Sequence, residues 1–130
     1  MKTITLSLLA ILLLGGIYLS VQESSYQNEA SGESANNVTT EDGKQIVAIT
    51  ARGGYSPKIS SAKAGIPTII RMKTRGAFDC SSSVVIPSIG YQGFLPTSGE
   101  TNIDVPAQKA GTTLQGMCGM GMYRFQIQFS

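Results

Sequence analysis

The chain has 130 residues, a net charge of +2, two cysteines and no histidine. Its length suits one modest domain with accessory segments. Without histidine a Ser-His-Asp triad is impossible, and the three acidic residues beyond residue 43 show no spacing typical of an acid–base pair. We therefore predict that the chain is not an enzyme and takes no small-molecule substrate.

The N-terminal segment 1–21 is predicted to be a membrane anchor. Ile4–Val21 is an 18-residue run without charge, which as a helix would span about 27 Å, close to the bilayer's hydrocarbon thickness. A cleaved signal peptide is the alternative, but the cleavage motif after the run is poor. We predict a single transmembrane helix and a location at the cell membrane. Lys2 precedes the span, whereas Glu23 and Glu29 follow it, so the positive-inside rule places the rest of the chain outside the cytoplasm.

Residues 22–43 are predicted to be a flexible polar and acidic linker, because they contain almost no large apolar side chains. Residues 44–130 are basic, with nine Lys and Arg against three acidic residues. The basic residues are scattered singly, so we interpret them as a solvated surface and expect no nucleic-acid partner.

Short β-like runs separated by turn residues fill the domain at 44–130, and no stretch shows sustained helical periodicity. The last run alternates, with Tyr123, Phe125, Ile127 and Phe129 on one face. This pattern predicts an all-β sandwich whose last strand is half buried. The predicted strands are Gln45–Thr50, Tyr55–Ile59, Thr68–Thr74, Ser83–Ile86, Thr101–Val105, Thr113–Gln115 and Met122–Phe129.

Most of the sulfur lies in the segment "GMCGMGMYRF" at 116–125. On an extended chain Cys118, Met120 and Met122 would share one face, opposite the apolar face that contains Phe125. Thiolate and thioether donors together favour Cu(I). Zinc normally takes four thiolate or imidazole ligands, and calcium needs clustered oxygens. A type 1 electron-transfer copper site needs two imidazoles, which this chain cannot supply.

Two structural interpretations stay open beside metal binding. Cys80 and Cys118 can form a disulfide, which would stabilise a small β-sandwich outside the cytoplasm. The methionines can fill irregular gaps in the core. Copper binding, which we favour, predicts two titratable thiols in fresh protein, whereas a disulfide predicts none.

Residues 53–127 resemble a cupredoxin-like domain. The resemblance rests on Gly-Tyr-Ser-Pro at 54–57, Ala-Gly-Ile-Pro at 64–67, Cys80 with Val-Ile-Pro at 85–87, and Cys-Gly-Met-Gly-Met at 118–122. It implies a cupredoxin-like Greek-key β-sandwich or barrel, in which sulfur replaces the usual histidine ligands. The sequence is most similar to the CupA-like family of membrane-anchored Cu(I) chaperones, and to the amino-terminal domain of copper-exporting P-type ATPases.

This resemblance implies a copper chaperone of copper resistance and homeostasis that binds two Cu(I) ions and delivers copper to an exporting P-type ATPase. Cys80 and Cys118 would be bridging thiolate ligands, and Met120 and Met122 would be thioether ligands of a weaker site. Met117 is a neighbour outside this set. The resemblance also implies a domain on the cytoplasmic face, against the charge rule, and the side stays open. An electron-transfer cupredoxin is the alternative within the fold.

Overall fold

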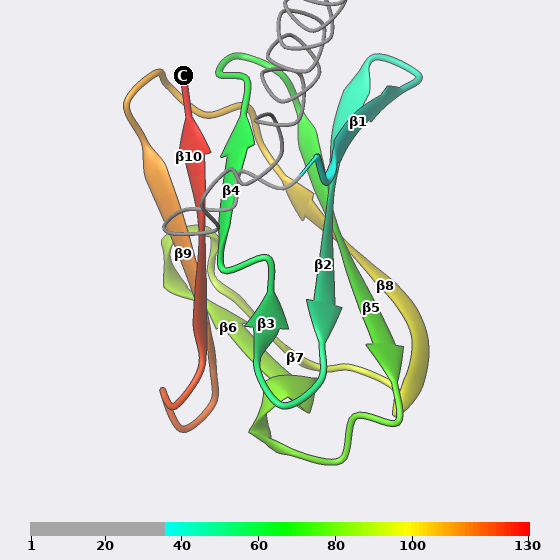
Figure 1. Ribbon diagram of the computed structural model, residues 1–130. Helices are drawn as coiled ribbons and strands as arrows, with labels where there is room; N and C mark the ends of the chain where they lie inside the picture. Colours follow the sequence, from blue (N-terminus) through cyan, green and yellow to red (C-terminus); the bar gives the residue numbers. More distant parts are fainter. Residues whose placement is uncertain (1–35) are drawn as a thin grey trace, which may run out of the picture. The chain divides into compact units, whose positions relative to one another are not determined.

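The computed structural model describes residues 36–130. These residues form short β-strands and two single-turn 3-10 helices (Figure 1). The predicted anchor at 1–21 and the linker up to residue 35 lie outside this range, and within it no helix is long and apolar enough to cross a membrane. The elements are β1 (Val38–Glu41), β2 (Lys44–Ala51), β3 (Tyr55–Ser56), β4 (Ile59–Ala62), β5 (Thr68–Arg75), η1 (Cys80–Ser82), β6 (Ser83–Ile86), η2 (Pro87–Ile89), β7 (Tyr91–Phe94), β8 (Ser98–Val105), β9 (Thr113–Cys118) and β10 (Arg124–Phe129).

The strands form two sheets. In the first sheet the order is β1-β2-β5-β8, with β3 paired to β2; in the second it is β4-β10-β9-β6-β7. Each sheet contains one parallel pair, β2 with β5 and β4 with β10, and its other pairs are antiparallel. Because parallel neighbours cannot be joined by a tight hairpin, the chain crosses between the two sheets.

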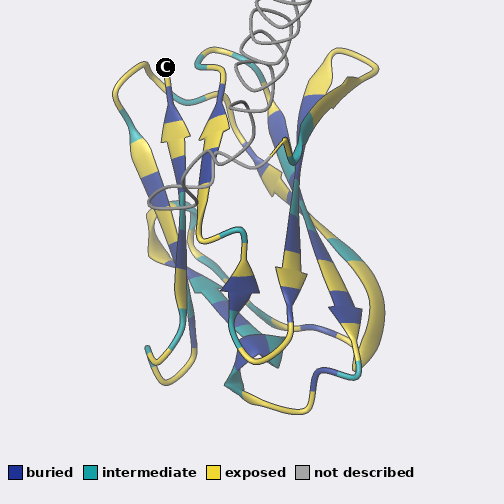
Figure 2. Ribbon diagram, in the orientation of Figure 1, coloured by how far each residue is buried: buried dark blue, intermediate teal, exposed yellow. Residues whose placement is uncertain are grey.

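A single core lies between the sheets. Strands β5, β9 and β10 each alternate between buried positions on the inner face and exposed or partly buried positions on the outer face (Figure 2). Apolar side chains on the inner faces exclude water from the space between the sheets. The predicted all-β sandwich is therefore confirmed. The most buried apolar residues of the core include Val47, Ile49, Ile70, Met72, Val84, Ile86, Ile103, Leu114, Ile127 and Phe129.

Three differences from the predicted strands have local causes. Strand β1 lies inside the range predicted as linker, where Val38–Glu41 pairs with β2 across the turn at Asp42 and Gly43. The run predicted as Tyr55–Ile59 divides into β3 and β4, because Pro57 has no N–H to donate to a strand partner. Strand β7 pairs with β6 although its alternation is too short to predict it.

Candidate functional site

The two cysteines meet at one end of the sandwich. Cys80 begins η1, and Cys118 is the last residue of β9, where it lies opposite Val84 of β6. Their Cα atoms are 5.7 Å apart although 38 positions separate them in the chain, and their sulfur atoms form a disulfide. Both the copper-binding and the disulfide interpretation require the cysteines to lie this close. Their oxidised state is the one that the disulfide interpretation expects.

Cys118 lies on the core side of its strand, not on the polar face that its spacing predicted. Only 1% of its surface is exposed, and it packs in the central cluster with Leu114 and Phe125. The prediction was wrong because Cys118 ends β9 and the chain turns before β10 begins at Arg124. Counting alternate positions from Met122 back to Cys118 crosses this turn, where a two-residue period has no meaning.

The turn places the two methionines in solvent. The Cys118 N–H donates to the Tyr123 carbonyl at 3.0 Å, and the Gly121 N–H donates to the Cys118 carbonyl at 2.8 Å. Gly121 has φ +70°, a left-handed conformation that favours glycine. Met120 is 80% exposed and Met122 is 66% exposed. Neither methionine is core filler, and both lie in the loop that directly follows a buried cysteine.

The Cys118 sulfur is also a hydrogen-bond acceptor, since the Tyr123 N–H points to Sγ at 3.4 Å. Backbone N–H groups that point at sulfur stabilise negative charge there when the sulfur is a thiolate. The loop therefore offers the thiolate form of Cys118 a ready donor.

Asp79 holds the other cysteine in place. Its carboxylate caps η1 by accepting from the Ser81 N–H at 2.7 Å and from the Ser81 hydroxyl, and it also accepts from the Gly53 N–H at 2.7 Å. These hydrogen bonds, chiefly those from Ser81, lower the pKa of Asp79. The cap fixes the short helix that carries Cys80 to the loop between β2 and β3. This role of Asp79 was not predicted, although the Asp-Cys-Ser-Ser order at 79–82 is typical of an N-cap.

Tyr55 supports the site from inside the sandwich. Its hydroxyl donates to the Ser83 carbonyl at 3.1 Å, and its ring meets Phe125 edge to face with centroids 5.1 Å apart. Burial, with a smaller contribution from the charge of Asp79, raises the pKa of Tyr55 to about 12. This role of Tyr55 was not predicted, because its partners come from strands that are distant in the sequence.

An open depression of about 460 Å³ adjoins Met122. Arg52, Lys58 and Arg124 line it together with Tyr123, and no acidic residue contributes to its wall. The loop that contains Met120 and Met122 therefore lies beside a depression lined by positive charges. No spacing in the sequence brings these three cations together.

Within residues 36–130 no group of three or more His, Cys, Asp or Glu residues is placed to hold a metal. The two cysteine sulfurs are bonded to each other, and two thioethers are exposed in the adjoining loop. Only after reduction of the disulfide could both cysteines act as metal ligands. A carboxylate or imidazole site is thus not available in that range. Sulfur is the only soft donor that the site offers, and sulfur suits Cu(I).

No protein-family model matches the chain, and no curated protein matches it by sequence. Solved structures that share its fold include two copper-binding proteins. The metal-binding domain of the Streptococcus pneumoniae D39 Cu(I)-exporting P-type ATPase CopA, solved with Cu(I), matches with a TM-score of 0.63 and 23% identity over 72% of this chain and 92% of that one. A copper-binding protein solved in its apo form by NMR matches with a TM-score of 0.65 and 22% identity over 72% of this chain and 94% of that one. At identities this low, the structural similarity shows a shared fold and nothing further.

Proposed function

We propose that this chain binds Cu(I) through sulfur and passes it to an acceptor protein. The observation that carries the proposal is the meeting of Cys80 and Cys118 next to a loop that exposes Met120 and Met122. The fold likeness to two domains described as copper-binding supports it. The choice of Cu(I) follows from the exclusively soft donors.

Copper binding requires reduction of the disulfide. A small thiol or phosphine reductant supplies two electrons, the S–S bond breaks, and two protons complete the thiols of Cys80 and Cys118. Binding of Cu(I) then releases these protons as each sulfur becomes a thiolate ligand. The reductant is oxidised in the same step, a thiol to its own disulfide. The reduced chain is therefore the copper carrier, and the oxidised chain offers copper no thiolate.

The two kinds of sulfur would have different tasks. Thiolates at Cys80 and Cys118 carry charge and hold copper tightly, and the resemblance to CupA-like chaperones implies that they bridge two ions. Neutral thioethers at Met120 and Met122 bind more weakly and would complete the second site. An ion held partly by exposed thioethers can leave by ligand exchange with an incoming sulfur donor.

We further propose that the acceptor is a copper-exporting P-type ATPase and that segment 1–21 holds the chain at the cell membrane. This arrangement would serve copper resistance, since it places the carrier beside the exporter. A cytoplasmic domain would meet a reducing environment that keeps the thiols free, whereas an external domain would keep the disulfide. A membrane-impermeant thiol reagent, applied to intact cells together with a membrane-impermeant phosphine reductant, distinguishes the two sides, because it labels the cysteines only if the domain is external.

An anaerobic Cu(I) titration of the pre-reduced full chain against bathocuproine disulfonate tests the proposal. We expect two equivalents to be retained, and Cys80→Ser to weaken the tight one at least about a hundredfold, on the order of 2.7 kcal/mol. Cys80 is the less buried cysteine, so this variant disturbs the core least. Cys118→Ser should give the same loss.

Ser82→Ala is the matched control, because Ser82 lies in the same short helix but carries no sulfur. It should bind copper like the unmodified chain. Equal Cu(I) affinity in the unmodified chain and both cysteine variants would contradict the proposal.

The disulfide favours a second candidate function, a stapled β-sandwich that acts in adhesion or assembly. Closing a loop of 38 residues stabilises the fold by about 4 kcal/mol in the chain-entropy model. In this case the cysteines stay oxidised in cells and the reduced chain binds no copper. Thiol labelling of freshly lysed cells under acid quench separates the two candidates, since the copper carrier shows two reactive thiols and the staple shows none.

A further inference from the structure

Exposed apolar side chains gather at the end of the sandwich that holds the disulfide. Among residues 36–130 the large hydrophobic side chains that are exposed are Ile59, Phe78, Phe94, Met120 and Met122. Phe78 precedes Cys80 by two positions, and Phe94 pairs with Ser83, next to the strand position opposite Cys118. With the two methionines, Phe78 and Phe94 form what we call the apolar rim. Phe78 is 84% exposed and Phe94 is 82% exposed, so neither contributes to the core.

The same end carries four cations that form no ion pair within residues 36–130. Arg52 follows β2, Arg75 ends β5, Arg124 begins β10, and Lys58 shares a depression with Arg52 and Arg124. None of these four, which we call the cationic flank, takes part in an ion pair within residues 36–130. Figure 1 shows the loop after β2, the end of β5 and the start of β10 at the same lower end of the molecule; these segments carry Arg52, Arg75 and Arg124.

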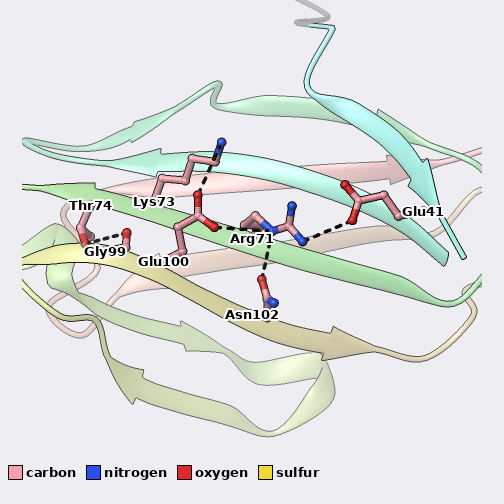
Figure 3. Close-up of polar contacts among 7 residues, drawn as sticks. All are labelled: Glu41, Arg71, Lys73, Thr74, Gly99, Glu100 and Asn102. Carbon is pink, nitrogen blue, oxygen red and sulfur yellow. Dashed lines mark hydrogen bonds and ion pairs between the residues drawn. The ribbon is translucent and has the colours of Figure 1, made fainter.

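The middle of the first sheet shows the opposite arrangement. Arg71 pairs with Glu41 at 3.5 Å and with Glu100 at 3.9 Å, and Lys73 pairs with Glu100 at 3.8 Å (Figure 3). These cations are neutralised by Glu100 on the adjacent strand β8 and by Glu41 on β1, which is two strands away. At the disulfide end Asp79 accepts from Ser81 and Gly53 and forms no ion pair among the described residues, and Glu100 lines a depression with Arg52 and Arg75. The four cations of the flank outnumber these two carboxylates, so a net positive charge remains at this end.

We propose that the apolar rim and the cationic flank together form the docking face for an acidic protein domain that accepts Cu(I). The inference rests on the proposed function. Phenylalanine, methionine and arginine are enriched at protein interfaces, and scattered solvent-exposed lysines are not. Opposite charge on the partner speeds encounter and fixes orientation. The partner must bring its own soft donors to Met120 and Met122, and a lipid surface has none.

Copper transfer from the pre-reduced, Cu(I)-loaded full chain in neutral detergent tests the docking face. The probe is the metal-binding domain of the Streptococcus pneumoniae Cu(I)-exporting P-type ATPase, and native mass spectrometry follows the copper. We expect Arg52→Glu with Arg124→Glu to slow transfer at least about tenfold at low ionic strength. Added salt should slow the unmodified chain and have little effect on this variant.

The matched control reverses two cations at the opposite end, Lys63→Glu with Lys109→Glu. Lys63 follows β4 and Lys109 precedes β9, and neither is in an ion pair within the described range. The change in net charge is identical, so a specific face predicts less than about a twofold effect. Equal slowing by both pairs, or by neither, would overturn the proposal.

The apolar rim is tested separately by Phe78→Ser with Phe94→Ser, with Ile59→Ser as the control at the sheet edge. We expect at least about tenfold slower transfer for the rim pair only. Each variant is first titrated with Cu(I), so that a chain unable to bind copper counts against the proposed function and not against the docking face.

A lipid surface is the competing occupant. The chain is reconstituted into phosphatidylcholine vesicles with and without phosphatidylglycerol. Suppose that the anionic lipid blocks copper transfer and that Arg52→Glu with Arg124→Glu restores it. This result would assign the face to the membrane and overturn the proposal. Transfer that is insensitive to the lipid supports the protein partner.

Discussion

Cys118 and Met122 are four positions apart, yet they lie in opposite environments. Cys118 ends a strand and is 1% exposed, whereas Met122 lies in the following loop and is 66% exposed. The boundary is the turn that the Cys118 N–H and carbonyl close with Tyr123 and Gly121. A buried cysteine sulfur held by the core and an exposed thioether held by a loop should respond differently to mutation, because only the first is fixed by packing.

Under the proposed function, the difference would let one short segment both retain a metal and release it. Moving Cys118 disturbs the central cluster, so its position is defined to within the tolerance of core packing. Met120 has an exposed side chain and can change rotamer at little energetic cost. The segment is therefore a fixed donor followed by adjustable ones.

The largest expected effect is on the buried side. A Cβ added at Gly116 would overlap the ring of Phe125, which lies opposite it in the β9–β10 ladder. Because the ring is itself buried, Gly116→Ala should lower the free energy of unfolding by about 3 kcal/mol. Urea denaturation of the oxidised chain measures this loss. Met120→Ala is the loop control and should change stability by less than about 0.5 kcal/mol; similar losses in both would erase the distinction.

The next effect belongs to the loop. Met120→Ala with Met122→Ala should weaken the second Cu(I) equivalent about tenfold, on the order of 1.4 kcal/mol, and leave the first unchanged. The reason is that the thioethers complete only the weaker site. Competition titration of the reduced chain measures both equivalents.

Met117→Ala is the matched control, since Met117 is partly buried on β9 opposite Val85 and faces away from Cys118 along the strand. It should leave both equivalents unchanged. Copper binding that ignores the loop pair but depends on Met117 would show that the ligand set is wrong.

The smallest effect concerns pH and again separates buried from exposed groups. Burial raises the pKa of Tyr55 to about 12 from its ordinary value of 10.0. The neutral form of Tyr55 is therefore favoured in the folded state. Its contribution to the free energy of unfolding is complete below pH 10 and is lost as pH rises through 12. We expect the oxidised chain to lose on the order of 1 kcal/mol by pH 11.

Urea midpoints at pH 9 and pH 11 measure this difference. Tyr55→Phe should reduce it, whereas Tyr123→Phe in the loop should leave it in place. An alkaline loss of the same size in Tyr55→Phe would assign the effect to other groups.

The alternation of apolar side chains determined much of the fold before any coordinates. Strands β2, β5 and β6 agree with their predicted ranges to within one residue at each end. Their runs are long or rich in β-branched residues, so local pattern and tertiary packing agree. Strands β1 and β7 were not predicted, because they are four residues long and mostly exposed. Only pairing with β2 and β6 defines them.

For the candidate site, the sequence determined the chemistry and the tertiary structure decided the arrangement. Sulfur without histidine limits the choice of metal whatever the fold, because ligand softness belongs to the residue type. Burial of Cys118, exposure of Met120 and Met122, and the cap that Asp79 places on Cys80 depend on where strands end. Strand ends are set by turns and by contacts between distant segments, and a periodic pattern along the chain contains neither.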